Sequence, residues 1–373
     1  MEVILQRREF FKQIGTVTIL VAGGRVWRAR PQSSAEIGEG PAFEPWRSWR
    51  ADSQEGLLVL VHAAILSSNA FNTQPWLFTV TSSAIKIYAD TARNLGEFDP
   101  YLREMFFSIG CALENLLLAA RANGLEARVT LPPGKLAPPS REPKPELAVR
   151  IELSSGDRVA SELFDAIPHR HTNRSIFDAS REIPVEFIHS ITHVVREDDE
   201  GVRLFLFVSE GDRKQIADVI WEASRNFMAD PAVGRGTKPW YRSSIDDVQK
   251  LRDGAYIGDP DPASYVDSMM SGRLFGLIAA RDRYDRPQTI RAGRVWQRAH
   301  LLATARDIAA RPANGAVEII DHEKRLHLEP KTSALLAQLT ADISWQPTFM
   351  FYMGYPTRPA AASARRGVHD VLI

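Results

Sequence analysis

The sequence has only one cysteine, Cys111, among 373 residues. It can therefore form no disulfide within the chain and no cage of thiolate ligands around a metal. It also has no net charge, because 46 lysines and arginines balance 46 aspartates and glutamates. A neutral protein has no long-range field that favours nucleic acid or an anionic membrane. Any phosphate site must be a local cluster of basic residues, and redox chemistry would need a cofactor.

Several motifs of common enzymes are also missing. No Gly-x-Gly-x-x-Gly follows a predicted strand, and residues 234–238 lack the spacing of a P-loop. The nine histidines show neither a His-Glu-x-x-His motif nor the spacing of a facial triad, and we interpret His322 and His327 as part of a charged surface turn. No nucleophile elbow with a Ser-His-Asp order is present. The sequence therefore predicts no Rossmann site, no metal site and no catalytic triad.

The first residues suggest an export signal. Gln6 to Lys12 read Gln-Arg-Arg-Glu-Phe-Phe-Lys and resemble the twin-arginine motif, and a weakly apolar stretch follows over 14–22. That stretch is shorter than the ~20 residues that a membrane-spanning helix needs. We expect export to the periplasm, or otherwise out of the cytoplasm, by the twin-arginine translocase, with the signal either cleaved or kept as an anchor. The alternative is a basic amphipathic helix.

The remaining chain shows alternating helix and strand patterns. The patterns predict helices over 55–66, 104–123, 161–167, 212–228 and 293–310, and strands over 77–80, 85–88, 147–153, 202–208 and 348–353. Residues 229–285 are polar and rich in turn residues, and we interpret them as an insertion that forms either a lid or a plain surface excursion. The predicted parts are a signal and linker over 1–40, a first half over 41–150 and a second half over 151–373.

Two of the predicted helices look like copies of each other. Aligning Gly110 with Gly293 also matches Leu118 with Leu301, Ala120 with Ala303, Ala122 with Ala305, Ala127 with Ala310 and Arg128 with Arg311. Alanine-rich helices align easily by chance, but strands of similar character flank both copies. We therefore predict an internal duplication of one α+β unit.

The most informative stretch lies between a predicted buried helix and a strand. Residues 67–76 read Ser-Ser-Asn-Ala-Phe-Asn-Thr-Gln-Pro-Trp. Their hydroxyl and carboxamide groups supply the donors and acceptors that a flavin needs along its pyrimidine edge and near its reactive ring nitrogen. A helix cap followed by a turn is the alternative interpretation, and it explains the serines but not Asn72, Gln74 or the Pro-Trp pair.

This loop resembles the Ser-Ser-x-Asn-x-Gln-Pro-Trp signature of flavin-dependent nitroreductases. Residues 99–105, Asp-Pro-Tyr-Leu-Arg-Glu-Met, also look like that family, particularly its internally duplicated, Acg-type branch. The resemblance implies an α+β nitroreductase-like fold, with two related halves fused in one chain that acts as a monomeric pseudo-dimer. It also implies FMN as the cofactor, with these loop residues as ligands: Ser67, Ser68, Asn69, Asn72 and Gln74.

Basic residues later in the chain suggest a phosphate clamp. Arg170, Thr172 and Arg174 alternate, so they would project from one side of an extended segment. A solvated basic turn is the alternative. The cluster is similar to the Arg-x-Ser-x-Lys pattern with which nitroreductases hold the FMN phosphate. In that family a basic pair on the C-terminal arm reaches the same phosphate, which implies Arg365 and Arg366 as further ligands.

The positions of these elements predict how many flavins are bound. In dimeric nitroreductases each flavin lies between subunits, with the polar loop from one and the arginine clamp from the other. Here the loop lies in the first half and the clamp in the second, so we expect one FMN per chain.

The resemblance also implies an activity. It predicts an FMN-dependent oxidoreductase that passes hydride from a reduced nicotinamide, NAD(P)H, to a small electron-poor acceptor such as a nitroaromatic or a quinone, with no obligatory catalytic side chain. One alternative is a protein that binds or sequesters FMN, or senses redox state, without turnover. Another is a structural protein on a decayed flavin fold.

Overall fold

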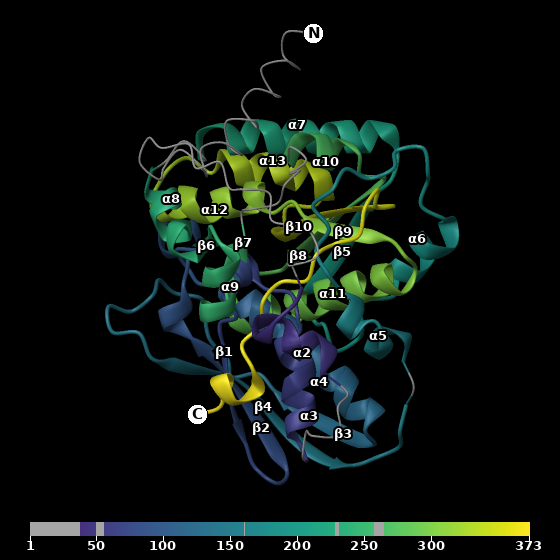
Figure 1. Ribbon diagram of the computed structural model, residues 1–373. Helices are drawn as coiled ribbons and strands as arrows, with labels where there is room; N and C mark the ends of the chain where they lie inside the picture. The colour runs from purple at the N-terminus through teal and green to yellow at the C-terminus, as the bar shows by residue number, and fades with distance from the viewer. Residues whose placement is uncertain (1–37, 50–55, 160, 228–230, 257–264) are drawn as a thin grey trace.

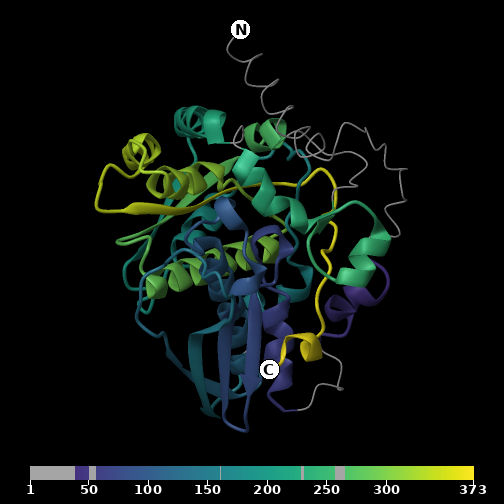
Figure 2. The same ribbon diagram turned by 90° about the vertical axis from the view of Figure 1, so that its left-hand side faces the viewer.

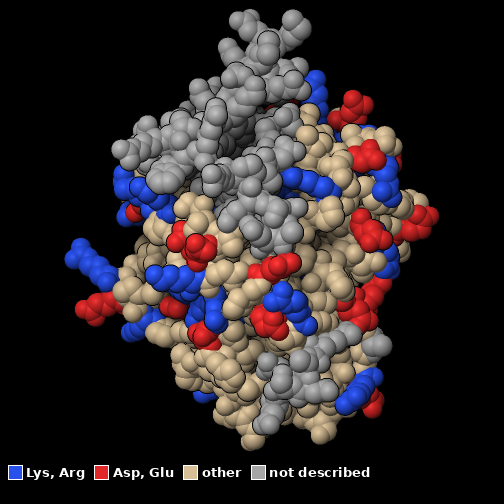
Figure 3. Space-filling view, viewed as in Figure 1, with Lys and Arg blue, Asp and Glu red and all other residues tan. Residues whose placement is uncertain are grey.

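The computed structural model describes residues 38–49, 56–159, 161–227, 231–256 and 265–373. The predicted twin-arginine segment lies outside these ranges. Short elements begin the described chain, a 3-10 turn over Pro41–Phe43 and helix α2 over Glu44–Arg47. Lysine and arginine side chains are mixed with aspartate and glutamate over the visible described surface (Figure 3), as the balanced composition predicts.

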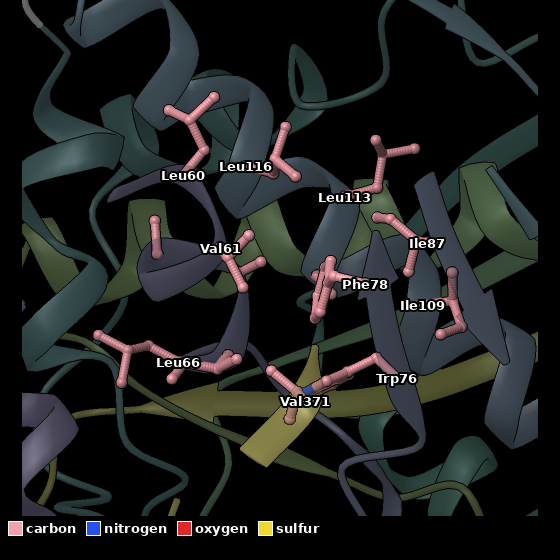
Figure 4. Packing of buried hydrophobic residues seen from close by; sticks show 14 of the residues in the cluster. Leu60, Val61, Leu66, Trp76, Phe78, Ile87, Ile109, Leu113, Leu116 and Val371 are labelled. Carbon is pink, nitrogen blue, oxygen red and sulfur yellow. The ribbon is translucent and has the colours of Figure 1, made fainter. Parts of the chain in front are cut away.

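The first half is built on a four-stranded antiparallel sheet. Its strands are β1 (Trp76–Val80), β2 (Ala84–Asp90), β3 (Leu125–Thr130) and β4 (Pro145–Ser155), in the order β1-β2-β4-β3. Burial alternates along β2, so one face of the sheet is in the core. Helices α3 (Leu58–Ile65) and α4 (Arg103–Ala122) pack on that face. Figure 4 shows Val61 of α3 and Leu113 of α4 beside Phe78 of β1.

The second half repeats this plan. Its strands are β5 (Val202–Phe207), β8 (Leu274–Ala280), β9 (Ala309–Pro312) and β10 (Gln346–Gly354), also antiparallel, in the order β5-β8-β10-β9. Helix α11 (Arg286–Ala305) lies between β8 and β9 in the chain, as α4 lies between β2 and β3. Both halves therefore have the same strand order and the same place for the long helix. This confirms the predicted α+β fold of two related halves in one chain.

The two long helices join the halves at a close crossing. A Cβ added to Gly110 would lie 2.0 Å from the carbonyl oxygen of Ile290, and one added to Gly293 would lie 2.0 Å from the carbonyl oxygen of Phe107. Each clash is with the residue three positions before the other glycine, so the crossing is symmetric. In Figures 1 and 2 the two sheets lie on opposite sides of α11. Helix α4 is apolar and long enough to cross a membrane, but most of it is buried inside the protein.

Further helices cover the second sheet. They are α6 (Val185–Thr192), α12 (Gly315–Arg325) and α13 (Lys331–Thr340), whereas α5 (Glu162–Asp165) packs against α11 and α4. The sequence pattern did not predict the helices α6, α12 and α13. It also did not predict the strands β3 and β9. The predicted helix over 293–310 is shifted, because α11 ends at Ala305 and residues 309–312 form β9. The alignment of Ala127 with Ala310 nevertheless matches residues of β3 and β9.

The insertion of the second half has different bounds from those predicted. Only residues 81–83 join β1 to β2, whereas β5 and β8 are joined by α7 (Glu210–Phe227), α8 (Pro231–Thr237), β6 (Tyr241–Arg242), α9 (Ile245–Leu251), β7 (Ala255–Tyr256) and α10 (Tyr265–Met270). Residues 274–280, inside the predicted insertion of 229–285, are instead the central strand β8. Every residue of β8 is buried, so it lacks the alternation that marks a half-buried strand. The first sheet also extends past residue 150, because β4 ends at Ser155.

The described part of this insertion lies against the first half. Trp240 donates from Nε1 to the carbonyl oxygen of Asn94 over 3.1 Å, and Arg93 forms an ion pair with Asp253. A Cβ on Gly236 would lie 1.9 Å from the carbonyl oxygen of Leu95, so the two backbones touch there. The insertion is therefore packed across the boundary between the halves.

A buried ionic cluster is the second link between the halves. Arg103 of α4 donates from Nε to Asp321 of α12 over 2.6 Å, and Arg283 and Tyr284 each reach the other carboxylate oxygen of Asp321 over 2.9 Å. Asp99 lies beside this cluster and accepts a bond from the backbone N–H of Met105. Burial, followed by the negative charge of Glu104 nearby, raises the pKa of Asp99 to about 7.

We expect Gly110→Ala to destabilise the protein strongly, by about 1–3 kcal/mol or more, because the new methyl group would overlap a backbone carbonyl. Gly234→Ala in α8 is the matched control, since a Cβ there meets nothing within 4 Å. Urea unfolding of both variants measures the difference. Equal stability of the two would show that the helices do not cross this closely.

We expect the contribution of Asp99 to the stability of the protein to fall as the pH rises from about 4 to 7 and to level off above that. The pKa of Asp99 is about 7 when folded and near 3.9 when unfolded, so its contribution is present at low pH and is lost between about pH 4 and 7. Asp99→Asn keeps an oxygen for Met105 but cannot ionise. The stability of the wild type relative to this variant should fall by about 1.4 kcal/mol per pH unit between pH 5 and 7. A constant difference in urea unfolding across that range would contradict the raised pKa.

Candidate functional site

The polar loop predicted from the sequence has a strained backbone. Phe71, Asn72 and Gln74 have φ angles of 49°, 53° and 48°, in the left-handed region that residues other than glycine rarely adopt. Each such residue costs on the order of 1–3 kcal/mol and persists only where surrounding contacts enforce it. One enforcing contact is the ring of Phe71, which packs edge to face against Phe98 and Tyr241.

Asn72 is fixed by two distant segments. Its Nδ2 donates to the carbonyl oxygens of Gly254, in the insertion, and Ala364 over 3.1 and 2.9 Å. Its Oδ1 accepts from Arg365 over 2.6 Å. The side chain is buried, and its amide therefore holds the insertion and the C-terminal arm, which we define as residues 355–373, against the loop.

The other two carboxamides of the loop are also engaged. Gln74 donates from Nε2 to the carbonyl oxygen of Arg252 and accepts the backbone N–H of Arg366, both over 2.8 Å. Asn69 accepts the backbone N–H of Gln74 over 2.8 Å and donates to the carbonyl oxygen of Ser67 over 3.3 Å. The carboxamides predicted to bind a flavin ring thus hold the chain itself in this conformation.

Two buried arginines meet beside the loop. Arg170 donates from Nη2 to the carbonyl oxygen of Leu66 over 3.0 Å, and Arg365 donates from Nη2 to that of Ser67 over 3.1 Å. Both residues are only 2% exposed. The structure therefore brings together the loop of the first half and one arginine from each predicted basic cluster, as the resemblance implied.

These two guanidiniums have no acidic counterpart. Among the described residues neither arginine forms an ion pair with a carboxylate, and the Nε atoms of both are buried without a hydrogen-bond partner. The Oγ atom of Ser67 is in the same state. Burial lowers the pKa of Arg170 to about 10, and burial followed by the charge of Arg170 lowers the pKa of Arg365 well below its usual value. Because buried charges are costly when unpaired, this cluster favours an anion.

Two histidines complete the surroundings of the arginine pair. Nδ1 of His300, on α11, lies 3.4 Å from both Nη1 of Arg170 and Oγ of Ser68. Burial lowers the pKa of His171 to about 3, with the charges of Arg170 and Arg365 adding to the effect. Burial and Arg170 also lower the pKa of His300 well below its usual value. Both imidazoles are therefore neutral at pH 7 and add no charge to the site.

Trp46 of α2 lies over the arginine pair. Its ring centroid is 4.7 Å from the guanidinium carbon of Arg365 and 5.9 Å from that of Arg170, and its Nε1 donates to the carbonyl oxygen of Ser363 over 2.7 Å. The negative face of an indole attracts cations, so this ring partly offsets the missing carboxylate. Nothing in the sequence around Trp46 or His300 indicated their place at the site, whereas His171 lies within the predicted basic cluster.

The structure leaves the other predicted phosphate ligands elsewhere. Arg174 is exposed, and its carbonyl oxygen accepts from Arg311, whereas Arg170 is buried. Arg170 has extended dihedral angles, but the side chain of Asn173 accepts from the backbone and hydroxyl of Ser175, and the chain bends at Ser175, next to Arg174. The alternation argument is therefore wrong for this pair. Thr172 is half-buried between them.

Arg366 also differs from its predicted place. Its Nη1 donates to the carbonyl oxygen of Gln74 over 3.3 Å and its Nη2 to that of Asp370 over 2.5 Å. The charge of Arg93, not that of Arg170, is the one that helps to lower its pKa after burial. The adjacent residues Arg365 and Arg366 thus contact different residues of the loop.

The alignment of the two long helices relates the arginine site to a position at the other end of the helix crossing. That position is not a second anion site. The alignment of Gly110 with Gly293 makes Glu114 the counterpart of Gln297, which accepts the backbone N–H of Ser68 over 3.1 Å. Glu114 instead binds Arg294 over 2.9 Å and Arg298 over 2.6 Å. Arginines at that end are compensated by carboxylates. Of the two related positions, only the one at Arg170 and Arg365 leaves its guanidiniums uncompensated among the described residues.

We expect inorganic phosphate to raise the melting temperature of the protein and Arg170→Met to abolish that effect, because the buried guanidinium pair is the anion's partner. The variant without ligand should be as stable as the wild type or more so, since an unpaired buried charge is removed. Arg174→Met, at an exposed position of the same cluster, is the matched control and should respond like the wild type. A phosphate effect that survives Arg170→Met would contradict this assignment.

No protein-family model matches the chain. Two relatives come from Mycobacterium tuberculosis, strains CDC 1551 and H37Rv, and each is assigned by name as an NAD(P)H nitroreductase. Each is 24% identical to this chain over 342 residues. The match covers 84% of this chain and 91% of the relative.

Solved structures of nitroreductases are also similar. The one with bound FMN from Bacteroides fragilis has 14% identity and a TM-score of 0.35, over 56% of this chain and 95% of its own. The one from Anabaena variabilis has 10% identity and a TM-score of 0.44, over 73% and 69%. Along most of its length the chain is similar in sequence to nitroreductases, in agreement with the predicted nitroreductase-like fold.

Proposed function

We propose that the protein binds one FMN per chain and is an FMN-dependent oxidoreductase of nitroreductase type. The observation that carries this proposal is the buried pair of Arg170 and Arg365, which lies without a carboxylate against a loop that resembles the nitroreductase signature. The name of the mycobacterial relatives supports NAD(P)H as the transient electron donor. The acceptor would be a small electron-poor molecule such as a nitroaromatic or a quinone.

The residues at the arginine pair fit the phosphate of FMN. A phosphate dianion offers several acceptor oxygens, and charge-assisted bonds from guanidinium groups are the strongest that proteins make to it. The two Nε atoms and the hydroxyl of Ser67 are buried without a partner, so each has a donor available for such an oxygen. We assign Arg170, Arg365 and Ser67 to holding the phosphate.

The predicted ligands of the flavin ring fit less well. Asn72 and Gln74 already bond to main-chain groups of the insertion and the C-terminal arm. We therefore propose that these two side chains hold the loop in its strained conformation. Ser68 and Asn69, which are half-buried next to the arginine pair, are better placed to contact the rest of the cofactor.

The protein would contribute binding and environment to the reaction. FMN, when bound, supplies the transfer of hydride from the nicotinamide to the acceptor. The chain holds the phosphate, keeps the two nearby histidines neutral and covers the arginine pair with Trp46. Export by the twin-arginine route remains part of the proposal, on Gln6 to Lys12 alone, and cell fractionation would test it.

A protein that binds FMN without turnover is the second candidate. It is favoured by the closure of the site, since segments 252–254 and 364–366 are bonded across the loop and both arginines are 2% exposed. Such closure would keep a nicotinamide away from the flavin. Storage of FMN or sensing of redox state would then be the function.

We expect the purified protein to show a flavin absorbance spectrum and to release one FMN per chain on denaturation, because one anion site is uncompensated. Arg170→Met should weaken FMN binding about 10-fold to 100-fold, the worth of one charge-assisted bond, and Arg174→Met should not. Two equivalents of FMN per chain, or none after incubation with excess FMN, would refute the model. Steady-state oxidation of NAD(P)H with a nitroaromatic then separates the candidates, since flavin without turnover leaves only the second.

A further inference from the structure

A surface cavity of about 300 Å³ opens in the second half, away from the arginine pair. It is lined by residues of α5, of α6 with the turn that follows it, and of α11. Elements of the two halves correspond when they hold the same place in the chain relative to the strands of their sheet. By this criterion α6 corresponds to α3, α11 corresponds to α4, and α5 corresponds to the C-terminal arm. The cavity therefore lies among the counterparts of elements that build the arginine site, but its side chains are different.

Two histidines one helical turn apart face this cavity. His189 lies in α6 and His193 directly follows that helix, and the centroids of their rings are 4.7 Å apart. Residues at positions i and i+4 of a helix share one face, so both rings can reach the same point. Both side chains are exposed, so an ion in solvent can reach them.

The ring of His193 is held in an orientation typical of metal ligands. Its Nδ1 lies 2.9 Å from the carbonyl oxygen of His189 and 3.3 Å from the hydroxyl of Thr192. A carbonyl only accepts, so the proton is on Nδ1 and the lone pair is on Nε2. Histidines that bind metals almost always donate their second ring N–H to a carbonyl or carboxylate in this way.

The charged side chains around the cavity are already paired. Glu162 forms an ion pair with Arg306, and Arg298 donates to Glu114 over 2.6 Å and to the carbonyl oxygen of Val194 over 2.7 Å. Arg196 lies 3.5 Å from Glu114. The imidazoles are therefore the groups of the cavity best able to bind a ligand.

We propose that His189 and His193 bind a divalent transition-metal ion such as Ni²⁺, Zn²⁺ or Cu²⁺. Imidazole suits these ions, and bonds of about 2.0–2.1 Å from two rings one turn apart would cross-link the last turn of α6. Within the described residues no group of three or more His, Cys, Asp and Glu side chains is placed to hold a metal. Water therefore completes the coordination shell in the cavity. The bound ion has no part in the proposed flavin chemistry.

The test is calorimetric titration of the full chain with NiCl₂ in buffer without chelators. One saturable site per chain and a rise in melting temperature are expected, because a ligand that binds only the folded state stabilises it. His189→Gln and His193→Ala should each weaken binding tenfold or more. His369→Ala removes another exposed histidine and is the matched control, with binding as in the wild type.

Two further measurements separate this site from other causes of binding. Excess EDTA should reverse the rise in melting temperature, because a chelator removes the bound ion. Arg170→Met should leave it unchanged, so failure of the flavin proposal and failure of this one are distinguishable. The absence of saturable Ni²⁺ binding to the wild type, or binding that survives His189→Gln, would overturn the inference.

Discussion

The close crossing of α4 and α11 at Gly110 and Gly293 is the contact on which the rest of the molecule depends. Because neither glycine has a side chain, the two helix backbones touch, and each helix can reach the polar loop between the halves. Ser108 of α4 binds the backbone of Ala70, and Gln297 of α11 binds that of Ser68. With larger residues at the crossing, the helices would stand further apart and the loop would lose one of these supports. The glycines therefore set the geometry of the site from within the core.

The same crossing produces two related positions, and charge decides how they differ. At one end Glu114 and Asp199 neutralise Arg294 and Arg298, so that end is a structural ion network. At the other end, within the part of the chain that the structure describes, Arg170 and Arg365 meet neutral groups and the face of an indole but no carboxylate. Desolvation makes the second arrangement unfavourable until an anion arrives. The two related positions of the fold therefore differ in charge compensation, and only the uncompensated one is suited to the anion that we propose.

Local sequence patterns identified the parts of the site that are local. The loop and Arg170 were found because each lies in a short motif whose chemistry is visible without the fold, whereas Arg365 was implied only by the family resemblance. Arg174 was misplaced because alternation along the segment does not show which side chains become buried, and Arg174 is exposed beside a bend at Ser175. Trp46 and His300 left no signal, since only tertiary packing brings them to the arginines. Strand β8 was missed because burial on both faces removes the alternation of polar and apolar residues. Since β8 was missed, the predicted bounds of the insertion were also wrong.

Trp46 and Ser363 are 317 residues apart in the chain and yet share a hydrogen bond beside the arginine pair. Arg365 follows β10, the last strand of the second sheet, and every strand of both sheets is made before it. Chains generally fold domain by domain during synthesis, so the first sheet, whose last strand ends at Ser155, can form while the arginine pair is still incomplete. Assembly of this site is thus a late event in the life of the polypeptide. Any anion held there must be captured by a protein whose framework already exists.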